Sequence, residues 1–231
     1  MQSKFKYMRK LFFTAILAVI TTGIFAQDYT SDQDKKVSFG VDIFYDIWQN
    51  KPVDMKSHGL SFGNSIYAIY EQFIWNKEGK FRLGLGAGIT THKLSTNTYI
   101  IDVNDSPITF TPIGEDIDYK KSKFVVNYLD FIGELRYKSK SNFRLAIGAK
   151  IGFRIDSHTT YKGEELNNSG LNIVVKHKDI QFIEKIRFAP TFRIGYGFVN
   201  LYMSYSLTKM FSETNGPELY PISIGFTLNP F

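Results

Sequence analysis

The sequence predicts an all-β protein, an eight-stranded antiparallel up-and-down transmembrane β-barrel, and three observations lead to this prediction. Apolar and polar residues alternate with a period of two along several long segments of the chain, as they do in strands with one apolar face. Many of these segments exceed the about 5 to 6 residues usual in globular domains and suit the roughly 9 to 11 that a tilted strand needs to cross a bilayer. Long and short connections alternate between them, which is typical of up-and-down membrane barrels.

The N-terminal segment predicts export from the cytoplasm. Residues 1–10 are basic and contain no acid, and the apolar residues 11–26 end in an alanine. This pattern is typical of a secretory signal peptide, predicted here over residues 1–26. The alternative, an N-terminal membrane anchor, is disfavoured because the apolar run is short for a span. Residues 27–36 then form a polar periplasmic lead-in, and the barrel occupies residues 37–231.

Charge and composition exclude several classes of function. The chain has 28 Lys and Arg against 22 Asp and Glu, a formal net charge of +6. Four of these bases belong to the predicted signal peptide, so the mature chain is close to neutral and no nucleic-acid partner is indicated. The sequence contains no cysteine, which excludes disulfides, thiolate zinc sites and cysteine nucleophiles. No cofactor is predicted.

The clearest element is a hairpin over residues 124–156. Two alternating segments flank the polar turn 139–142, and such a turn between alternating segments is typical of a β-hairpin. In the second segment the apolar residues share one face, while Arg144, Lys150 and Arg154 lie on the other with several glycines. The hairpin therefore predicts two long strands, each with one apolar and one charged face.

The remaining strands follow the same alternation. Segment 60–75 is the least regular, because Tyr67 and Ile69 share a face with Glu71. Residues 81–89 align without gaps on residues 143–151, so the hairpin unit recurs along the chain. The eight strands are predicted over residues 37–48, 60–75, 80–95, 124–138, 143–156, 181–196, 201–208 and 219–228.

The connections predict the orientation of the barrel. Those after the second, fourth and sixth strands are short, and those after the other strands are longer. We therefore expect the short turns and both chain ends in the periplasm and the long loops outside the cell. The short turns are 76–79, 139–142 and 197–200, and the long loops are 49–59, 96–123, 158–180 and 212–218.

Periodicity alone does not say which face points inward, so a soluble lipocalin-like barrel with an apolar interior is the structural alternative. Two observations favour an apolar face toward lipid. The polar faces combine glycine and serine with a few bulky charges, which suits the crowded interior of a narrow barrel. Tyrosines also recur near strand ends, where membrane barrels carry aromatic girdles: Tyr45, Tyr128, Tyr137, Tyr196 and Tyr220.

The apolar N-terminus, the alternating strands, the loop pattern and the terminal Phe231 together resemble the small outer-membrane β-barrels of the OmpA/OmpX-like porin superfamily. The chain is similar in particular to the group described as "outer membrane protein beta-barrel domain". The resemblance covers residues 37–231 and implies a place in the cell outer membrane of a Gram-negative bacterium, among outer-membrane lipids. One departure is that Phe226 and Leu228 are out of phase with the final aromatic residue, with Pro230 between them.

Charged residues on the polar faces are predicted to converge inside the barrel. Eight strands enclose a space just wide enough for side chains, and charges of mixed sign can be buried when they pair. We therefore favour an interior network of salt bridges over an open charged pore. Its predicted members are Asp130, Glu134, Arg136, Arg144, Lys150, Arg154, Lys185, Arg187 and Arg193.

Other patterns are weaker. Asp102, Asn104 and Ser106 have the spacing of a calcium loop, but the acid required at its twelfth position is replaced by Ile113, so no metal site is predicted. The alternating glycines of residues 84–88 lack the spacing of a phosphate loop and no helix follows, so they indicate strand packing.

The four histidines are His58, His92, His158 and His177, all in or near the long loops. On this side of the membrane, lipid-modifying barrels hold a His and Ser dyad, and the nearest candidates are Ser157 with His158, and His92 with Ser95. Neither pair forms a motif, so no catalytic residue is predicted.

The sequence favours a non-enzymatic barrel with a structural or partner-binding role. Loops 96–123 and 158–180 contain alternating segments around turn signals, which predict hairpins extending beyond the membrane. The edge of such a sheet can accept a strand from a protein partner. Two alternatives stay open: an accessory barrel of an envelope secretion or assembly machine and, less favoured, a lipid A-modifying hydrolase.

Overall fold

The structure is a computed structural model that describes residues 37–75, 80–100, 107–166, 170–212 and 214–228. The predicted signal peptide, the lead-in 27–36 and Phe231 lie outside these residues. The described chain is all-β, and no helix in it is long and apolar enough to cross a membrane. Its strands are β1 (Val37–Gln49), β2 (Phe62–Trp75), β3 (Phe81–Ser95), β4 (Thr98–Ile100), β5 (Phe110–Pro112), β6 (Tyr119–Lys138), β7 (Phe143–Glu164), β8 (Asn172–Lys178), β9 (Ile186–Tyr196), β10 (Val199–Tyr205) and β11 (Tyr220–Leu228).

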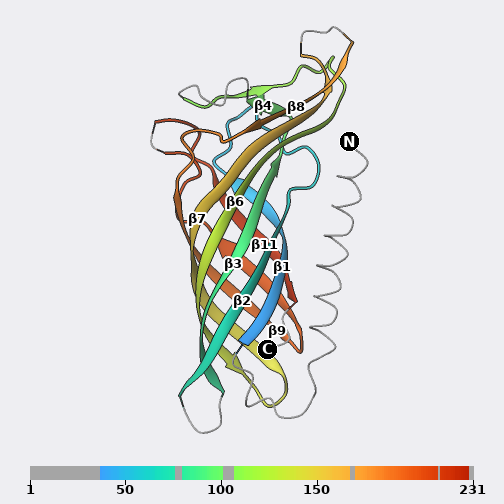
Figure 1. The fold of residues 1–231 in the computed structure, drawn as a ribbon. Coiled ribbons are helices and arrows are strands. Elements are labelled where there is room, and N and C mark those ends of the chain that lie inside the picture. The colour runs from blue at the N-terminus through green and yellow to red at the C-terminus, as the bar shows by residue number, and fades with distance from the viewer. Residues whose placement is uncertain (1–36, 76–79, 101–106, 167–169, 213, 229–231) are drawn as a thin grey trace, which may run out of the picture.

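The strands form a closed antiparallel barrel (Figure 1). The main sheet runs β6-β3-β2-β1-β11-β10-β9-β7-β8, and a further pairing of β6 with β7 closes it into an eight-stranded barrel, with β8 attached outside the closed ring. The predicted fold class is therefore confirmed. We call the end with the connections β6–β7 and β9–β10 the turn end, and the opposite end the loop end.

The outer wall of the barrel is apolar and its interior is polar. Charged and hydroxyl side chains are buried inside, whereas the apolar positions of the alternation point outward. This excludes the lipocalin-like alternative, which requires the reverse. Exposed residues of this apolar belt include Phe39, Ile43, Ile66, Leu85, Ile89, Leu129, Phe131, Leu135, Ile147, Ile151, Phe153, Ile186, Phe188, Leu201, Ile224 and Phe226.

Tyr128 corrects the prediction of an aromatic girdle. Its side chain is 1% exposed and lies inside the barrel, because it shares the inward parity of Asp130 on β6. Tyr196 is exposed on the outside, and Tyr45, Tyr137 and Tyr220 are half-buried.

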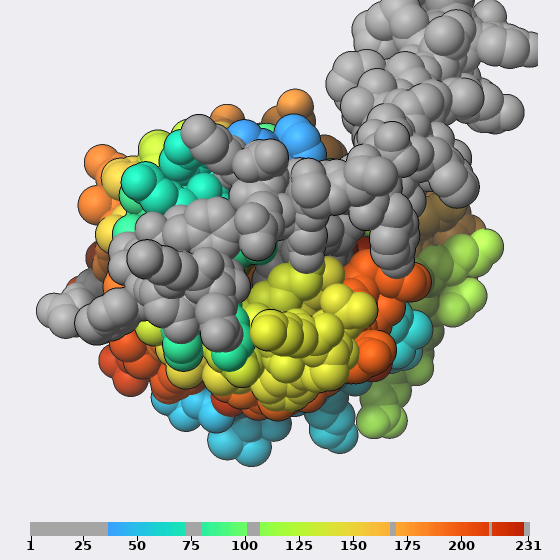
Figure 2. Space-filling model, turned by 90° about the horizontal axis from the view of Figure 1, so that it is seen from below, coloured from blue at the N-terminus to red at the C-terminus, as the bar shows by residue number. Residues whose placement is uncertain are grey.

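Two short turns meet at the turn end. The backbone N–H of Gly197, in the β9–β10 turn, donates to the carbonyl of Asn142, in the β6–β7 turn, at 3.0 Å. Both residues have a positive φ, of 62°, a conformation that glycine and asparagine adopt more readily than other residues. Seen from below, the two turns lie side by side as yellow and orange-red surfaces (Figure 2). The third predicted turn, 76–79, lies outside the described residues.

Strands β6 and β7 are longer than predicted. They have 20 and 22 residues, and β7 continues to Glu164 instead of ending at residue 156. A register shift between β6 and β7 at Asn127 and Tyr128 leaves Ile155 as an extra, bulged residue. Such a bulge exchanges the faces of the strand beyond it. Even-numbered residues of β7 point inward below Ile155, whereas Ser157 and Tyr161 are the buried ones above it.

Beyond the bulge the two strands leave the barrel as a sheet. The upper part of β7 pairs with β6 on one side and with β8 on the other, and we call this three-stranded part the loop-end sheet. Strand β9 pairs only with the lower part of β7, up to Phe153. It begins at Ile186, so the prediction that this strand starts at residue 181 was wrong. In Figure 1 the loop-end sheet rises well above the barrel wall.

Candidate functional site

The barrel interior is the first candidate site, because it gathers most of the predicted charged residues. Arg154 is half-buried at the loop end, where it donates to the carbonyl of Ile180 at 2.9 Å. Lys185 corrects the prediction: it precedes β9 and its side chain is exposed, not interior. The other predicted residues are all buried inside the barrel: Asp130, Glu134, Arg136, Arg144, Lys150, Arg187 and Arg193.

Arg193 joins three walls of the barrel. From β9, its guanidinium lies 3.0 Å from the Asp42 carboxylate on β1 and also contacts Glu134 on β6. Its carbon Cζ lies 5.0 Å from the ring centre of Tyr67 and 4.8 Å from that of Tyr202, close enough for cation–π attraction. A single side chain thus spans the interior from one side to the other.

Asp42 is shared by a second cation. The Lys150 Nζ, on β7, lies 3.2 Å from the Asp42 carboxylate and 3.3 Å from the Ser65 hydroxyl. Thr227 donates a further hydrogen bond to Asp42 at 2.6 Å. The carboxylate therefore receives hydrogen bonds from three strands, which is what allows a charge to remain stable inside a barrel.

A second group of charges lies closer to the loop end. Both oxygens of Asp130 are 3.0 Å from the Arg187 guanidinium, and Thr90 donates to the same carboxylate at 2.5 Å. Arg187 also contacts His92, whose Nδ1 lies 3.0 Å from Asp46. This group links β1, β3, β6 and β9.

A third group lies toward the turn end. Arg136 is 2.9 Å from Glu134 and 2.5 Å from Glu71, and Arg82 is 3.2 Å from Glu71. Glu134 connects this group to Arg193. The ion pairs thus continue along the barrel axis.

Sequence reasoning missed five members of this network. The signal for them was present, since each lies on the inward parity of its strand, but the prediction drew only on the later strands. They are Asp42, Asp46, Glu71, Arg82 and His92.

The glycines of β3 make room for this interior, as predicted for strand packing. A Cβ atom on Gly84 would lie 2.8 Å from the Ile69 side chain and 3.3 Å from the Arg136 Nε. A Cβ on Gly88 would lie 2.5 Å from the Tyr67 Cβ. The distances of 2.8 and 2.5 Å are too short for an added Cβ unless the neighbours shift, so glycine leaves space for bulky neighbours on β2 and β6.

An apolar cluster closes the barrel above the charges. Phe124 and Phe211 stack with their ring centres 5.7 Å apart, and Phe110 and Trp48 contact Phe124 edge to face. Several members come from loops, which is why strand periodicity did not predict the cluster. It consists of Trp48, Met55, Leu94, Ile100, Ile108, Phe110, Phe124, Val126, Tyr128, Ile180, Ile183, Met210, Phe211 and Leu219.

The predicted partner-binding loops form the loop-end sheet and a small hairpin over it. In loop 96–123, β4 pairs with β5 through Ile100 and Phe110. In loop 158–180, the upper part of β7 pairs with β8. Within the described ranges β8 has no strand on its other side, so one edge of the loop-end sheet is open.

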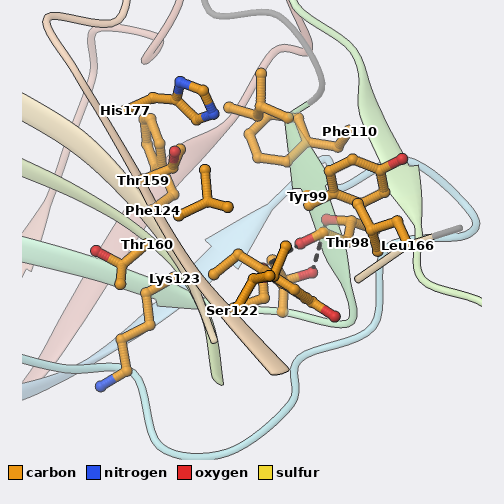
Figure 3. A pocket seen from close by; sticks show the side chains of 15 residues that line it. Thr98, Tyr99, Phe110, Ser122, Lys123, Phe124, Thr159, Thr160, Leu166 and His177 are labelled. Carbon is orange, nitrogen blue, oxygen red and sulfur yellow. Dashed lines mark hydrogen bonds between the residues drawn. The ribbon is translucent and has the colours of Figure 1, made fainter. Parts of the chain in front are cut away.

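A pocket of about 280 Å³ separates the β4–β5 hairpin from the loop-end sheet. Tyr99 and Phe110 approach it from the hairpin, and Phe124 and His177 from the sheet (Figure 3). The Ser122 hydroxyl donates to the Thr98 carbonyl at 2.5 Å and ties the two layers together. Lys123 and Thr160 extend away from the pocket in Figure 3, so the sheet has one face toward the pocket and one away from it.

The histidines are dispersed. His92 is buried in the barrel, His177 lines the pocket, and the His58 ring lies 4.9 Å from that of Tyr119. His158 hydrogen-bonds to Asp156 at 2.9 Å, on the opposite face of β7 from the buried Ser157.

The candidate dyads therefore do not assemble. The Ser157 hydroxyl accepts a hydrogen bond from the Ile180 N–H at 3.1 Å, and Ser95 donates to the carbonyl of Leu60 at 3.3 Å. No hydrogen bond joins either serine to His158 or His92 in the described part of the chain. The weak calcium pattern at Asp102, Asn104 and Ser106 lies outside the described residues. Elsewhere, the described side chains form no cluster of three or more acids and histidines suited to a metal ion.

Comparisons with known proteins show what the chain is similar to. The family model described as "Outer membrane protein beta-barrel domain" matches residues 19–212. No curated protein matches the chain. Among solved structures, the chain is similar to Ail, the attachment invasion locus protein of Yersinia pestis, crystallised with the heparin analogue sucrose octasulfate. The two are 9% identical with a TM-score of 0.37, over 84% of this chain and 97% of that one. A mutant porin of Rh. blastica is 7% identical with a TM-score of 0.22, over 84% of this chain and 99% of that one.

Proposed function

Because the chain belongs to the outer membrane protein beta-barrel domain family, we propose that it is a non-enzymatic barrel of the outer membrane that binds a protein partner at its loop-end sheet. Long loops of such barrels lie outside the cell, so the loop end is extracellular. The interior charges then serve to hold the barrel together, and the loop-end sheet is the surface that binds the partner.

The observation that carries this proposal is the way the interior is occupied. Side chains from opposite walls meet inside the barrel, as Arg193 does with Asp42 and Glu134, and the apolar cluster lies above them. An eight-stranded barrel has room for little more than its own side chains. Transport through the lumen is thus disfavoured, and the function is assigned to the outside.

The open edge of β8 supports partner binding. Leu171 is 63% exposed and Val174 is 67% exposed, both outside the apolar belt. An unpaired edge with exposed apolar side chains is a template for a strand of another chain. We therefore expect the partner to contribute an extended segment next to β8.

A conductance measurement tests the closed interior. The purified protein in planar bilayers is expected to give no stable channels. A steady conductance that changes in Arg193→Gln would overturn the assignment of the interior charges to a structural role.

Photo-crosslinking in living cells tests whether the loop-end sheet binds a protein partner. A photoreactive residue at position 171, at the extracellular tip, is expected to crosslink a protein partner. The control position is Lys140, exposed in the β6–β7 turn at the other end of the barrel. Crosslinks from position 140 alone would instead favour an accessory role in a periplasmic secretion or assembly machine.

Two further parts of the proposal have simple tests. Residues 1–26 act as a signal peptide, so the mature protein should begin at Gln27 by mass spectrometry. The barrel is not a lipid A hydrolase, so expressing it should leave the mass spectrum of lipid A unchanged. A changed spectrum that reverts with His158→Ala would establish the enzymatic alternative.

A further inference from the structure

The face of the loop-end sheet that points away from the pocket is strongly basic. Register places Lys123 opposite Thr160, which is opposite Lys176, so these residues form one row across β6, β7 and β8. The next row contains Lys121, Lys162 and Val174. We call this surface the lysine face. Its basic residues are Lys121, Lys123, Lys162, Lys176, Lys178 and His158 on the sheet, together with Lys93 at the adjoining end of β3.

The positive charges of this face are weakly compensated. Its two acids lie at its ends: Asp156 is bonded to His158 and Asn127, and Glu164 accepts from the N–H of Asp118. No ion pair in the described part of the chain involves any of the six lysines. Partial burial and repulsion from Lys121 and Lys93 lower the pKa of Lys123. The interior of the same barrel pairs its charges, so the unpaired lysines outside mark a surface suited to an external anion.

The position of the lysine face indicates which anion it meets. It continues the outward face of the barrel wall, because Lys121 and Lys123 share the parity of Leu129 and Phe131 on β6. We take Leu129 as the upper edge of the hydrocarbon, because it is the exposed apolar residue of β6 nearest the loop end. A strand rises about 3.3 Å per residue, and at a tilt of about 40° the two lysines lie roughly 15 to 20 Å above it. Phospholipid headgroups extend only about 5 to 8 Å beyond the hydrocarbon. The lysine face therefore stands at the level of the sugars attached to outer-leaflet glycolipids.

We propose that the lysine face binds phosphate groups on the saccharide of lipopolysaccharide in the surrounding outer leaflet. The site is the outer face of the sheet, whereas the proposed protein partner would pair with the backbone edge of β8, so lipid binding does not depend on a protein partner. Its ligand lies laterally beside the sheet, so binding would fix the height and orientation of the extracellular sheet above the membrane.

The test uses the full mature protein in neutral phosphatidylcholine vesicles that contain purified lipopolysaccharide. Binding is followed by fluorescence quenching with labelled lipopolysaccharide at low salt. The test variant combines Lys121→Gln, Lys162→Gln and Lys176→Gln, all exposed positions on the face. Because each lysine near an anionic lipid surface contributes roughly fivefold in affinity, the triple variant should bind at least about tenfold more weakly.

A matched control carries the same loss of charge away from the lysine face. Lys56→Gln, Lys140→Gln and Lys185→Gln change three exposed lysines outside it, and this variant should bind like the unchanged protein. Both variants should retain the heat-modifiable gel band of a folded barrel, since all six positions are exposed. Binding should also weaken with rising salt, because the attraction is between exposed charges.

Lipopolysaccharide stripped of phosphate, and soluble polyphosphate, complete the experiment. Loss of binding to the stripped lipid supports the proposal. Equal binding of the stripped lipid, or equal loss in both triple variants, would overturn it. Binding of polyphosphate without binding of lipopolysaccharide vesicles would also overturn it and assign the face to a soluble polyanion.

Discussion

The guanidinium of Arg193 lies 3.0 Å from the carboxylate of Asp42, which precedes it by 151 residues in the chain. The contact links β9 to β1, while the Lys150 ammonium reaches the same carboxylate from β7 at 3.2 Å. One acid on the first strand thus forms ion pairs with two cations from the second half of the chain. A buried carboxylate with two cationic partners is a sensitive point, because its removal leaves both cations undercompensated.

We expect Asp42→Asn to destabilise the barrel by about 3 to 5 kcal/mol, the usual effect of breaking a buried ion pair from one side. Urea unfolding in detergent micelles, followed by loss of the heat-modifiable band, measures the change. Asp54→Asn, at an exposed loop position, should be neutral to within about 0.5 kcal/mol. Equal stability of the two variants would show that Asp42 does not hold the interior together.

Replacing glycine by alanine should change the stability of the barrel differently on the inner and outer faces of the wall. A Cβ on Gly88 would meet the Ile66 carbonyl and the Tyr67 Cβ at 2.5 Å, whereas one on Gly133 would meet nothing closer than the Leu85 side chain at 3.9 Å. Gly88→Ala should therefore cost about 1 to 3 kcal/mol through overpacking. Gly133→Ala should be neutral or slightly stabilising. The same urea titration compares them, and a large loss in Gly133→Ala would contradict the outward placement of that residue.

The apolar cluster should hold the loops in place. Phe124 is 1% exposed and contacts Trp48, Phe110 and Phe211. Phe124→Ala should weaken the packing of this end by about 3 to 5 kcal/mol, and limited trypsin digestion should then cleave the loops at the loop end faster. Leu171→Ala, which truncates an exposed side chain, is the control and should leave the digestion rate unchanged. Slow digestion of Phe124→Ala would mean that the loops are held by other contacts.

Asp156 should titrate at unusually low pH. Partial burial acts to raise its pKa, but hydrogen bonds from His158 and Asn127 outweigh this and hold the pKa below its usual value of 3.8. Since the folded-state pKa is depressed, the carboxylate stabilises the loop-end sheet above the pKa of the unfolded chain. This contribution is lost as the pH falls through the folded-state pKa.

Carboxyl NMR chemical shifts in micelles measure this pKa directly. His158→Ala should raise the midpoint of Asp156. His177→Ala is the matched control, because His177 lines the pocket on the opposite face of the sheet. A midpoint that stays in place after His158→Ala would show that this hydrogen bond does not depress the pKa.

Alternation along the strands predicted most of the architecture, because each strand of a membrane barrel separates lipid from interior. The same rule placed Arg187 and Arg193 inside correctly. It failed for Lys185, which keeps their parity but precedes the first residue of β9. It also could not place Phe211 or Ile180, since loop residues that fold into the barrel mouth carry no periodicity.

Tyr128 shows a different limit of sequence reasoning. An aromatic residue near a strand end fits an interfacial girdle, yet Tyr128 packs inside, with the Arg187 guanidinium 4.6 Å from its ring centre. Strand parity pointed inward and aromatic preference pointed outward. Parity decided the outcome because a single residue cannot rotate out of an otherwise regular strand.

The bulge at Ile155 offsets the alternation of inward and outward residues along β7 by one position. Below it, one parity of β7 meets lipid, and above it the other parity carries Lys162 and His158 on the outer surface. Regular pairing of Ile155 with Asn127, without the bulge, would turn the upper part of β7 over, so that Lys162 would face the pocket and Tyr161 the outer surface. The bulge therefore decides which side chains of the upper part of β7 lie on the outer surface, because the same residues in regular register would present the opposite face.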